Sequence, residues 1–169
     1  KAARVVAVWH TIRVDKPLLA RLCSCQMIVR MGVGYDNVEI REAGRLGIPV
    51  CNIPDYGTEE VADSAISLIL GLFRGTLAGA ERLSRPGESF HGPDGIAAAC
   101  PYIRRVRGAP LGLVGLGRIG TAVAVRAKAC GFDVHFHDPH VADGFDKALG
   151  ITRQPSLDAL LAASACLSL

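Results

Sequence analysis

The clearest chemical signal in the sequence comes from three glycines, at positions 115, 117 and 120, and from Asp138. An apolar run precedes the glycines, an alanine-rich segment follows them, and a second apolar run ends at the aspartate. In a G-x-G-x-x-G turn, Gly115 permits a tight strand-to-helix connection, Gly117 lets the backbone approach a pyrophosphate and Gly120 allows close helix packing. The pattern predicts a dinucleotide site; the alternative is a glycine turn that binds no nucleotide.

The residues around this turn indicate which dinucleotide would bind. The N–H groups of Arg118, Ile119 and Gly120 would open the helix and face the phosphates. Asp138, 18 residues after Gly120, would end the second strand and accept hydrogen bonds from the ribose hydroxyls. At an effective dielectric near 20, two like charges 4 Å apart repel by about 4 kcal/mol, which disfavours a 2′-phosphate. We therefore expect NAD rather than NADP; protonation of His140 would soften this preference.

Other candidate chemistry is weaker. His135, His137 and His140 alternate in "HFHDPH", but no thiolate or carboxylate is spaced to complete a zinc set, so no metal is expected. The six cysteines form no C-x-x-C pair, which favours a reduced, intracellular protein. The basic cluster "RRVR" at 104–107 resembles a solvated surface more than a nucleic-acid patch, and we expect no direct nucleic-acid binding.

Composition is typical of a globular protein. Of the 169 residues, 50% are hydrophobic and 21% are charged, and the net charge is +3. The longest apolar stretch, Ile66 to Phe73, is far shorter than the roughly 20 residues of a membrane span, so no membrane association is expected. The chain starts at Lys1 without a signal-like segment or an initiator methionine, which leads us to expect a fragment.

Short apolar runs alternate with helix-like segments, a pattern that predicts parallel strands covered by helices. We therefore predict an α/β fold with a Rossmann-type, doubly wound parallel sheet, of which this chain holds part. The predicted strands are Val5–Trp9, Met27–Met31, Pro49–Ile53, Leu111–Val114, Asp133–His137 and Ala165–Leu169.

The segments between the strands carry helix signals. Asp36, with Glu39 three residues later, predicts a capped helix through Arg45 that Gly47 ends. Ser156 predicts the start of a last short helix. Residues 84–109 are rich in proline and glycine and predict a long surface loop with one helical turn at 96–99.

A longer helix is predicted from Thr58 to about Leu77, with two acidic residues in its first turn. It is apolar almost all round, which indicates burial on more than one side, at a domain or subunit contact. A domain hinge is expected just before it, near Pro54.

Long stretches of the sequence resemble one family. "IVRMGVGYDNVEI", "AGRLGIPVCNIPDYGTEEVADSA", "RGAPLGLVGLGRIGTAVAVRAKACGFDVHFHDP" and "DGFDKALG" are similar to the D-isomer-specific 2-hydroxyacid dehydrogenases, and within them to the C-terminal-binding protein branch. The resemblance implies two doubly wound domains: 1–54 as the end of a flavodoxin-like substrate domain, and 55–169 as the first half of the NAD-binding domain. It also implies that the helix over 58–77 forms a homodimer.

The resemblance assigns further roles by position. Arg30, Val33 and Gly34 would border the substrate carboxylate, and Val61 would touch the nicotinamide side. The branch typically has Ser, Thr and Tyr at the positions of Val33, Val61 and His137. The catalytic arginine, glutamate and histidine of the family are expected after Leu169, so no catalytic residue is expected in this chain.

Two functions follow as expectations. The first is NAD-dependent oxidation or reduction of a small 2-hydroxy or 2-keto acid by the intact protein in the cytoplasm, the chain alone being inactive. The alternative is an NAD(H)-sensing, dimeric transcriptional corepressor scaffold that recruits short peptides in the nucleus.

Overall fold

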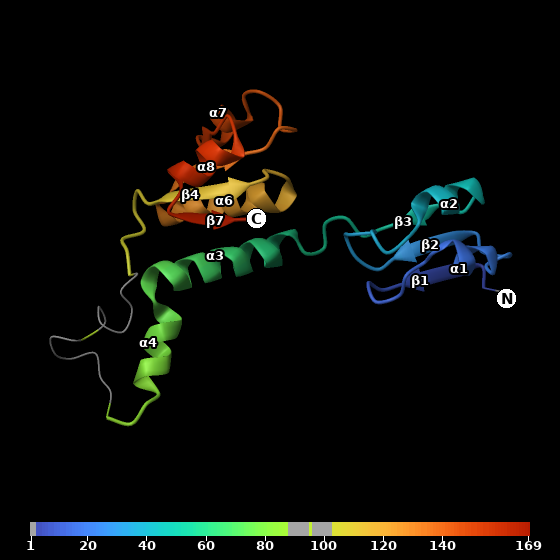
Figure 1. Ribbon diagram of the computed structural model, residues 1–169, viewed down its shortest axis with the longest axis horizontal. Coiled ribbons are helices and arrows are strands. Elements are labelled where there is room, and N and C mark those ends of the chain that lie inside the picture. Colours follow the sequence, from blue (N-terminus) through green and yellow to red (C-terminus); the bar gives the residue numbers. More distant parts are fainter. Residues whose placement is uncertain (1–2, 88–94, 96–102) are drawn as a thin grey trace. The chain divides into compact units, whose positions relative to one another are not determined.

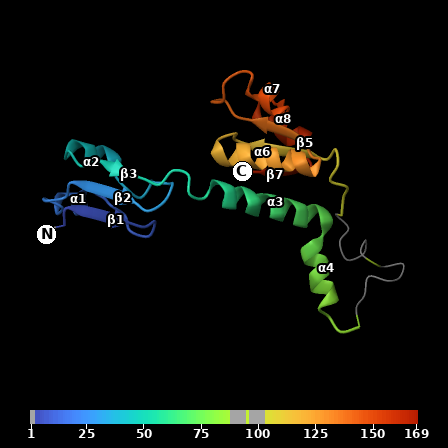
Figure 2. The same ribbon diagram turned by 180° about the vertical axis from the view of Figure 1, so that it is seen from behind.

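The computed structural model describes residues 3–87, 95 and 103–169. The chain divides into two compact units, Lys1–Gly57 and Thr58–Leu169 (Figures 1 and 2). The division falls three residues after the boundary expected from the sequence, between residues 54 and 55. Each unit is built on its own parallel sheet, and the mixed α/β class predicted from the sequence is confirmed. The predicted helical turn at 96–99 lies outside the described residues.

The first unit holds a three-stranded parallel sheet, ordered β1-β2-β3. Its strands are β1 (Val5–Val8), β2 (Met27–Arg30) and β3 (Val50–Cys51), each shorter than predicted. Helix α1 (Lys16–Ala20) follows β1 and helix α2 (Ile40–Arg45) follows β2. The core of this unit consists of Val8, Val14, Leu19, Ile28, Val38, Ala43 and Ile48.

The predicted cap at Asp36 is wrong. Helix α2 begins at Ile40 after the cap residue Glu39, and its start receives no side-chain hydrogen bond from the described part of the chain. The backbone over 35–38 forms a turn instead, in which Val38 N donates to Tyr35 O at 2.9 Å. The Glu39 carboxylate accepts from the backbone N–H of Lys16, 3.2 Å away, so this side chain serves α1 and not its own helix.

The second unit holds a four-stranded parallel sheet in the order β6-β5-β4-β7. Its strands are β4 (Pro110–Val114), β5 (Asp133–His137), β6 (Thr152–Arg153) and β7 (Cys166–Ser168). Strand β4 pairs with β5 on one side and with β7 on the other. The chain therefore builds the sheet in one direction from β4 to β6 and then reverses to add β7, as in the first half of a Rossmann sheet.

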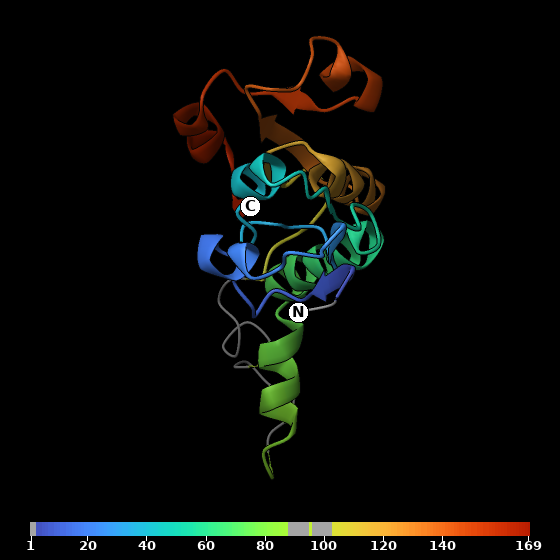
Figure 3. The same ribbon diagram turned by 90° about the vertical axis from the view of Figure 1, so that its right-hand side faces the viewer.

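Three helices connect these strands: α6 (Arg118–Cys130), α7 (Phe145–Leu149) and α8 (Leu157–Ala163). Because crossovers between parallel strands are right-handed, the reversal puts α8 on the face opposite α6 (Figure 3). The predicted cap at Ser156 is confirmed, since its hydroxyl accepts from Ala159 N at 3.1 Å.

The long helix predicted over 58–77 is two helices. Helix α3 runs over Thr58–Arg74 and α4 over Thr76–Leu83, with axes bent by 65°. Gly75 between them has φ of +61°, a left-handed conformation that ends α3. Within the described ranges, no single helix is long and apolar enough to cross a membrane, although this bent pair passes such a test by length and composition.

Helix α3 buries one face and not several. Ala62, Ile66, Ile69 and Phe73 recur at helical spacing and pack into the core of the second unit. Phe73 meets Phe132 edge to face, with ring centroids 5.1 Å apart. On the other side of α3, Leu68 and Leu72 are 67% and 61% exposed. The apolar pattern of this helix is thus only half used within the unit.

Candidate dinucleotide-binding site

The three glycines of the turn after β4 differ in backbone geometry and in the space around them. Gly115 has φ of +94°, which side chains rarely tolerate, and its N–H donates to His137 O at 2.9 Å. A Cβ on Gly120 would lie 2.4 Å from the carbonyl oxygen of Gly115, so this position excludes any side chain. A Cβ on Gly117 would meet no described atom within 4 Å. The turn is therefore tight on one side and open at Gly117.

Helix α6 starts directly at this opening. Its cap residue is Gly117, which has no side chain to satisfy the first amides, and no side-chain cap bond is present among the described residues. The first helical hydrogen bond runs from Thr121 N to Gly117 O, at 2.9 Å. By helix geometry, the N–H groups of Arg118, Ile119 and Gly120 are donors without an acceptor in their own helix. Together with the helix dipole they make the opening suitable for an anion.

Asp138 follows β5 and reaches back to the turn. Its Oδ2 accepts a hydrogen bond from Leu116 N, between the first two glycines, at 2.8 Å. Its Oδ1 accepts from His140 N, also at 2.8 Å. The hydrogen bond from Leu116, and next the one from His140, lowers the pKa of this carboxyl below its usual value. The ionised carboxylate of Asp138 thus holds the glycine turn through Leu116 N, a role that the sequence analysis did not predict. We call this contact the latch.

The latch leaves Asp138 able to bind a ligand. Each carboxylate oxygen has two acceptor positions and only one is used by a backbone N–H. The second position on each oxygen fits a hydroxyl donor such as a ribose. The carboxyl ends of parallel strands beside a reversal of strand order are also where open α/β sheets bind ligands, and the turn after β4 lies there.

The side chains of two histidines on β5 and of Arg153 on β6 are held mostly by backbone carbonyls. His137 Nδ1 lies 3.0 Å from Gln154 O, and His135 Nδ1 lies 2.9 Å from Gln154 Nε2. Arg153 donates to the carbonyls of Val141 and Ala142 at 2.8–3.1 Å, and its guanidinium lies over the ring of Phe136. Sequence analysis missed Arg153, because β6 carries no apolar run. The described ranges contain no group of three His, Cys, Asp or Glu residues suited to a metal ion.

Of the residues predicted to border the substrate, Arg30 ends β2, and Val33 and Gly34 lie on the loop that follows it. The guanidinium of Arg30 folds against Gly32, where a Cβ would lie 1.7 Å from Arg30 Nη1. Arg30 Nε is buried and has no hydrogen-bond partner among the described residues. Asn52, just after β3, donates from Nδ2 to Val33 O at 2.7 Å and holds the loop. The structure thus places Arg30 at the end of β2 and Val33 and Gly34 on the braced loop after it, and it adds Asn52, which the sequence analysis missed.

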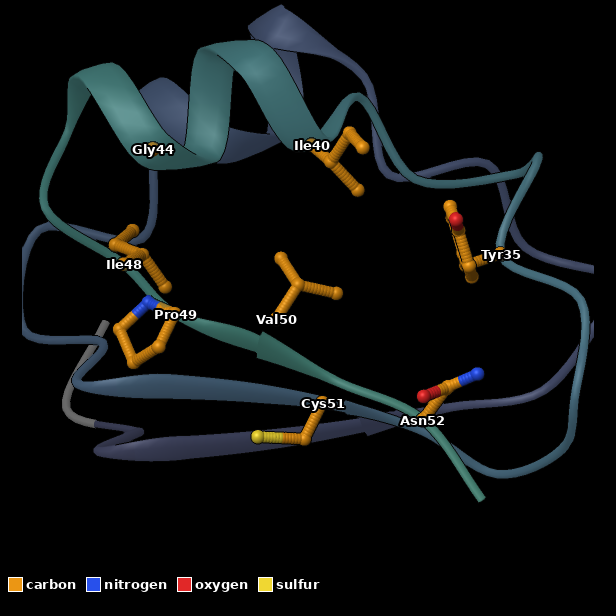
Figure 4. Close-up of a pocket in the computed structure, with 8 residues that line it drawn as sticks. All are labelled: Tyr35, Ile40, Gly44, Ile48, Pro49, Val50, Cys51 and Asn52. Atoms are coloured by element: carbon orange, nitrogen blue, oxygen red, sulfur yellow. The ribbon is translucent and has the colours of Figure 1, made fainter. Parts of the chain in front are cut away.

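A separate cavity of about 400 Å³ lies in the first unit between α2 and β3 (Figure 4). Figure 4 shows Val50 pointing from β3 toward Ile40, with Tyr35 and Asn52 at one end. Its lining is mostly apolar: Tyr35, Ile40, Gly44, Ile48, Pro49, Val50, Cys51 and Asn52. None of the residues predicted to bind substrate or cofactor lines it.

The fold and the motifs can be compared with those of known protein families. Residues 1–164 match the family described as "D-isomer specific 2-hydroxyacid dehydrogenase, catalytic domain", and the chain therefore belongs to that family. The family predicted from the sequence motifs is confirmed.

The chain is similar to two relatives of different kinds. It is 40% identical over 162 residues to C-terminal-binding protein 1 of Caenorhabditis elegans, and the match covers 96% of this chain and 22% of that protein. It is 35% identical over 159 residues to the glyoxylate reductase of Korarchaeum cryptofilum, covering 92% of this chain and 46% of that one.

Two solved structures have a similar fold. The D-lactate dehydrogenase of Aquifex aeolicus, complexed with NAD and lactic acid, matches with a TM-score of 0.86 and 28% identity over all of this chain and 48% of that one. The NADPH-dependent glyoxylate/hydroxypyruvate reductase of Sinorhizobium meliloti, in complex with citrate, matches with a TM-score of 0.79 and 33% identity over 98% of this chain and 49% of that one. The chain spans half or less of the length of each of these relatives.

Proposed function

We propose that this chain provides the dinucleotide-binding half-site and the substrate-facing loop of an NAD(H)-dependent 2-hydroxyacid dehydrogenase. The observation that carries the proposal is the glycine turn, open at Gly117 and latched by an ionised carboxylate, in a chain of this family. When bound, the nicotinamide would supply hydride transfer between a 2-hydroxy acid and the corresponding 2-keto acid.

The residues of the turn suit the cofactor. The N–H groups of Arg118, Ile119 and Gly120 would hold the diphosphate at the start of α6. Asp138 would accept the ribose hydroxyls with its remaining lone pairs while its bond to Leu116 keeps the turn in shape. This arrangement costs little reorganisation on binding, because the donors and the acceptor are already in place.

The preference for NAD over NADP rests on charge. The lowered pKa of Asp138 keeps it negative at neutral pH, where it repels a 2′-phosphate. Arg153 keeps its positive charge, but its Nη1 and Nη2 already donate to the carbonyls of Val141 and Ala142, which leaves fewer donors for a 2′-phosphate. Since one solved relative is NADPH-dependent, the preference has to be measured for this protein.

On the substrate side, we propose that Arg30, Val33 and Gly34 contact the carboxylate of a small 2-keto or 2-hydroxy acid. The support is the buried, unpaired Nε of Arg30 and the bracing of Val33 by Asn52. We propose that Val61 on α3 borders the nicotinamide. The proton donor and its partners are not assigned to any residue of this chain, so the chain alone is expected to be inactive.

We also propose a homodimer that uses the exposed face of α3, and a cytoplasmic location. Leu68 and Leu72 support the dimer, since large exposed apolar groups on one helix face favour association.

The proposed activity is tested with the full-length protein and a panel of 2-keto acids, by following NADH oxidation at 340 nm. We expect turnover with at least one small 2-keto acid and none without substrate. A rate of NADH oxidation equal to that of buffer alone for every 2-keto acid of the panel would exclude the proposed dehydrogenase activity.

The second candidate is an NAD(H)-sensing corepressor scaffold, favoured by the 40% identity to C-terminal-binding protein 1 over nearly the whole chain. It predicts binding of Pro-x-Asp-Leu-Ser peptides by the full-length protein, strengthened by NADH. Peptide binding without turnover would favour the scaffold, and turnover without peptide binding would favour the dehydrogenase.

A further inference from the structure

One arginine joins two helices of the second unit that are distant in sequence. Arg126, on α6, donates from Nε to Asp63 Oδ1 at 2.6 Å and from Nη2 to the carboxylate of Glu59, both on α3. Its Nη1 also donates to Ala122 O, at 3.1 Å, on its own helix. All three nitrogen atoms of the guanidinium therefore donate hydrogen bonds at once. We call Arg126 with Glu59 and Asp63 the clamp. The hydrogen bond with Glu59, and next that with Asp63, raises the pKa of Arg126.

This clamp is poorly suited to stabilise the fold. The side chains of Glu59 and Asp63 are 70% and 66% exposed, so water already solvates them and screens the attraction. The apolar contacts of Ala62, Ile66 and Ile69 hold α3 on the core without it. A planar guanidinium that engages two carboxylates does, however, restrict direction, because its donors lie in a fixed fork.

The clamp joins the two helices that carry the parts of the proposed cofactor site. Glu59 and Asp63 lie two residues before and after Val61 in the first turns of α3, on the opposite face of the helix, and the proposed function places Val61 at the nicotinamide. The helix that carries Arg126 opens with the N–H groups proposed to hold the diphosphate. Sliding or rotation of α3 along α6 would move Val61 relative to the diphosphate turn, and the clamp opposes this movement.

We propose that Arg126 is a positioning residue, which fixes the first turns of α3 against α6 and thereby sets the place of the nicotinamide relative to the diphosphate turn. This inference rests on the proposed function. It concerns only the nicotinamide end of the dinucleotide, because within the described residues Arg126 donates hydrogen bonds to Glu59, Asp63 and Ala122 and to neither the glycine turn nor Asp138.

The test compares two ligands on the full-length protein by isothermal titration calorimetry. NADH carries the nicotinamide, whereas ADP-ribose has the same diphosphate and adenosine without it. In Arg126→Ala we expect NADH affinity to fall about three- to tenfold and ADP-ribose affinity to stay within about 1.5-fold. The double variant Glu59→Ala with Asp63→Ala removes both acceptors from the other helix and should give the same selective loss. Arg126→Lys, which keeps the charge but not the fork, should restore only part of it.

Arg85→Ala is the matched control, since Arg85, two residues after α4, pairs with Glu81 of that helix at 2.6 Å and joins no second helix in the described part of the chain. It should change neither affinity. Equal loss of both ligands in the clamp variants would show a merely structural role and overturn the inference, as would unchanged NADH affinity. If Arg126→Ala does not fold, the Glu59 and Asp63 double variant decides by the same criteria. Wild-type protein that binds neither ligand would instead remove the proposed function itself, and this inference with it.

Discussion

The turn after β4 and the loop after β2 both follow a central strand of a parallel sheet, but they are held in different ways. In the turn, glycine geometry and one carboxylate fix the backbone, and the groups offered to a ligand are mostly N–H groups. In the loop, Asn52, just after β3, braces Val33, and the buried Nε of Arg30 at the end of β2 has no hydrogen-bond partner among the described residues. Both segments thus depend on a side chain that follows another strand, Asp138 for the turn and Asn52 for the loop. They differ in what they offer a ligand, which is a row of backbone N–H groups in the turn and a side chain beside the loop.

The largest effect is expected from crowding the turn. In Gly120→Ala, the new Cβ would lie 2.4 Å from the carbonyl oxygen of Gly115, and backbone cannot give way as a side chain can. We expect unfolding free energy to fall by about 1–3 kcal/mol and NADH affinity to fall by more than about tenfold. Chemical denaturation and NADH titration measure the two.

Gly44→Ala is the control for that variant. Gly44 lies inside α2, where a Cβ would meet no described atom within 4 Å, so the substitution should stabilise by about 0.5–1 kcal/mol. If Gly120→Ala also raised the free energy of unfolding and left NADH affinity unchanged, the close approach of α6 to the carbonyl of Gly115 would be wrong.

A smaller effect is expected from loosening the loop of the first unit. Asn52→Ala removes the hydrogen bond to Val33 O, so the KM for the 2-keto acid of the full-length enzyme should rise about three- to tenfold. The Kd for NADH should not change, because the turn after β4 is held without Asn52.

Asn37→Ala is the matched control for the loop. Asn37 braces a different segment, donating to Trp9 O at 2.9 Å and to Ile12 O at 2.7 Å, so its loss should lower Tm without raising KM. A KM that responds equally to both variants would contradict the role of the Val33 loop.

The smallest effect concerns the protonation of the latch. The folded pKa of Asp138 is lowered from the ordinary 3.8. The latch therefore adds stability above that ordinary value, and this stability is lost as pH falls through the lower folded pKa. The Tm difference between wild type and Asp138→Asn should be constant near neutral pH and shrink below about pH 4. A difference that grows on acidification would refute the ionised latch.

The sequence predicted what local chemistry determines. Strand β5 matches its predicted bounds, and Ser156 caps α8, because an apolar run and a hydroxyl at a helix start act within a few residues. Strand β6 was missed because Thr152 and Arg153 are polar and become a strand only by pairing with β5. The break at Gly75 was missed because the apolar period continues through it from α3 into α4.

In the candidate site, too, features set by local sequence were predicted and features that need a partner on another element were not. The glycines were recognised from spacing, and their three separate geometric reasons agree with that prediction. The bond from Asp138 to Leu116 spans 22 residues and depends on the register of β4 with β5, which no local pattern specifies. The same holds for Asn52 and Arg126, whose partners lie on other elements.

The central claim is that the bend after β4 binds a diphosphate while the carboxylate beside it recognises an unphosphorylated ribose. Titration of the full-length protein and of Asp138→Ala with NADH and NADPH tests it most directly. Wild type should prefer NADH by more than about a hundredfold, given like-charge repulsion of several kcal/mol. In the variant, NADH should bind more weakly, and the ratio of the NADPH Kd to the NADH Kd should become smaller. A variant that keeps the full preference would contradict the account.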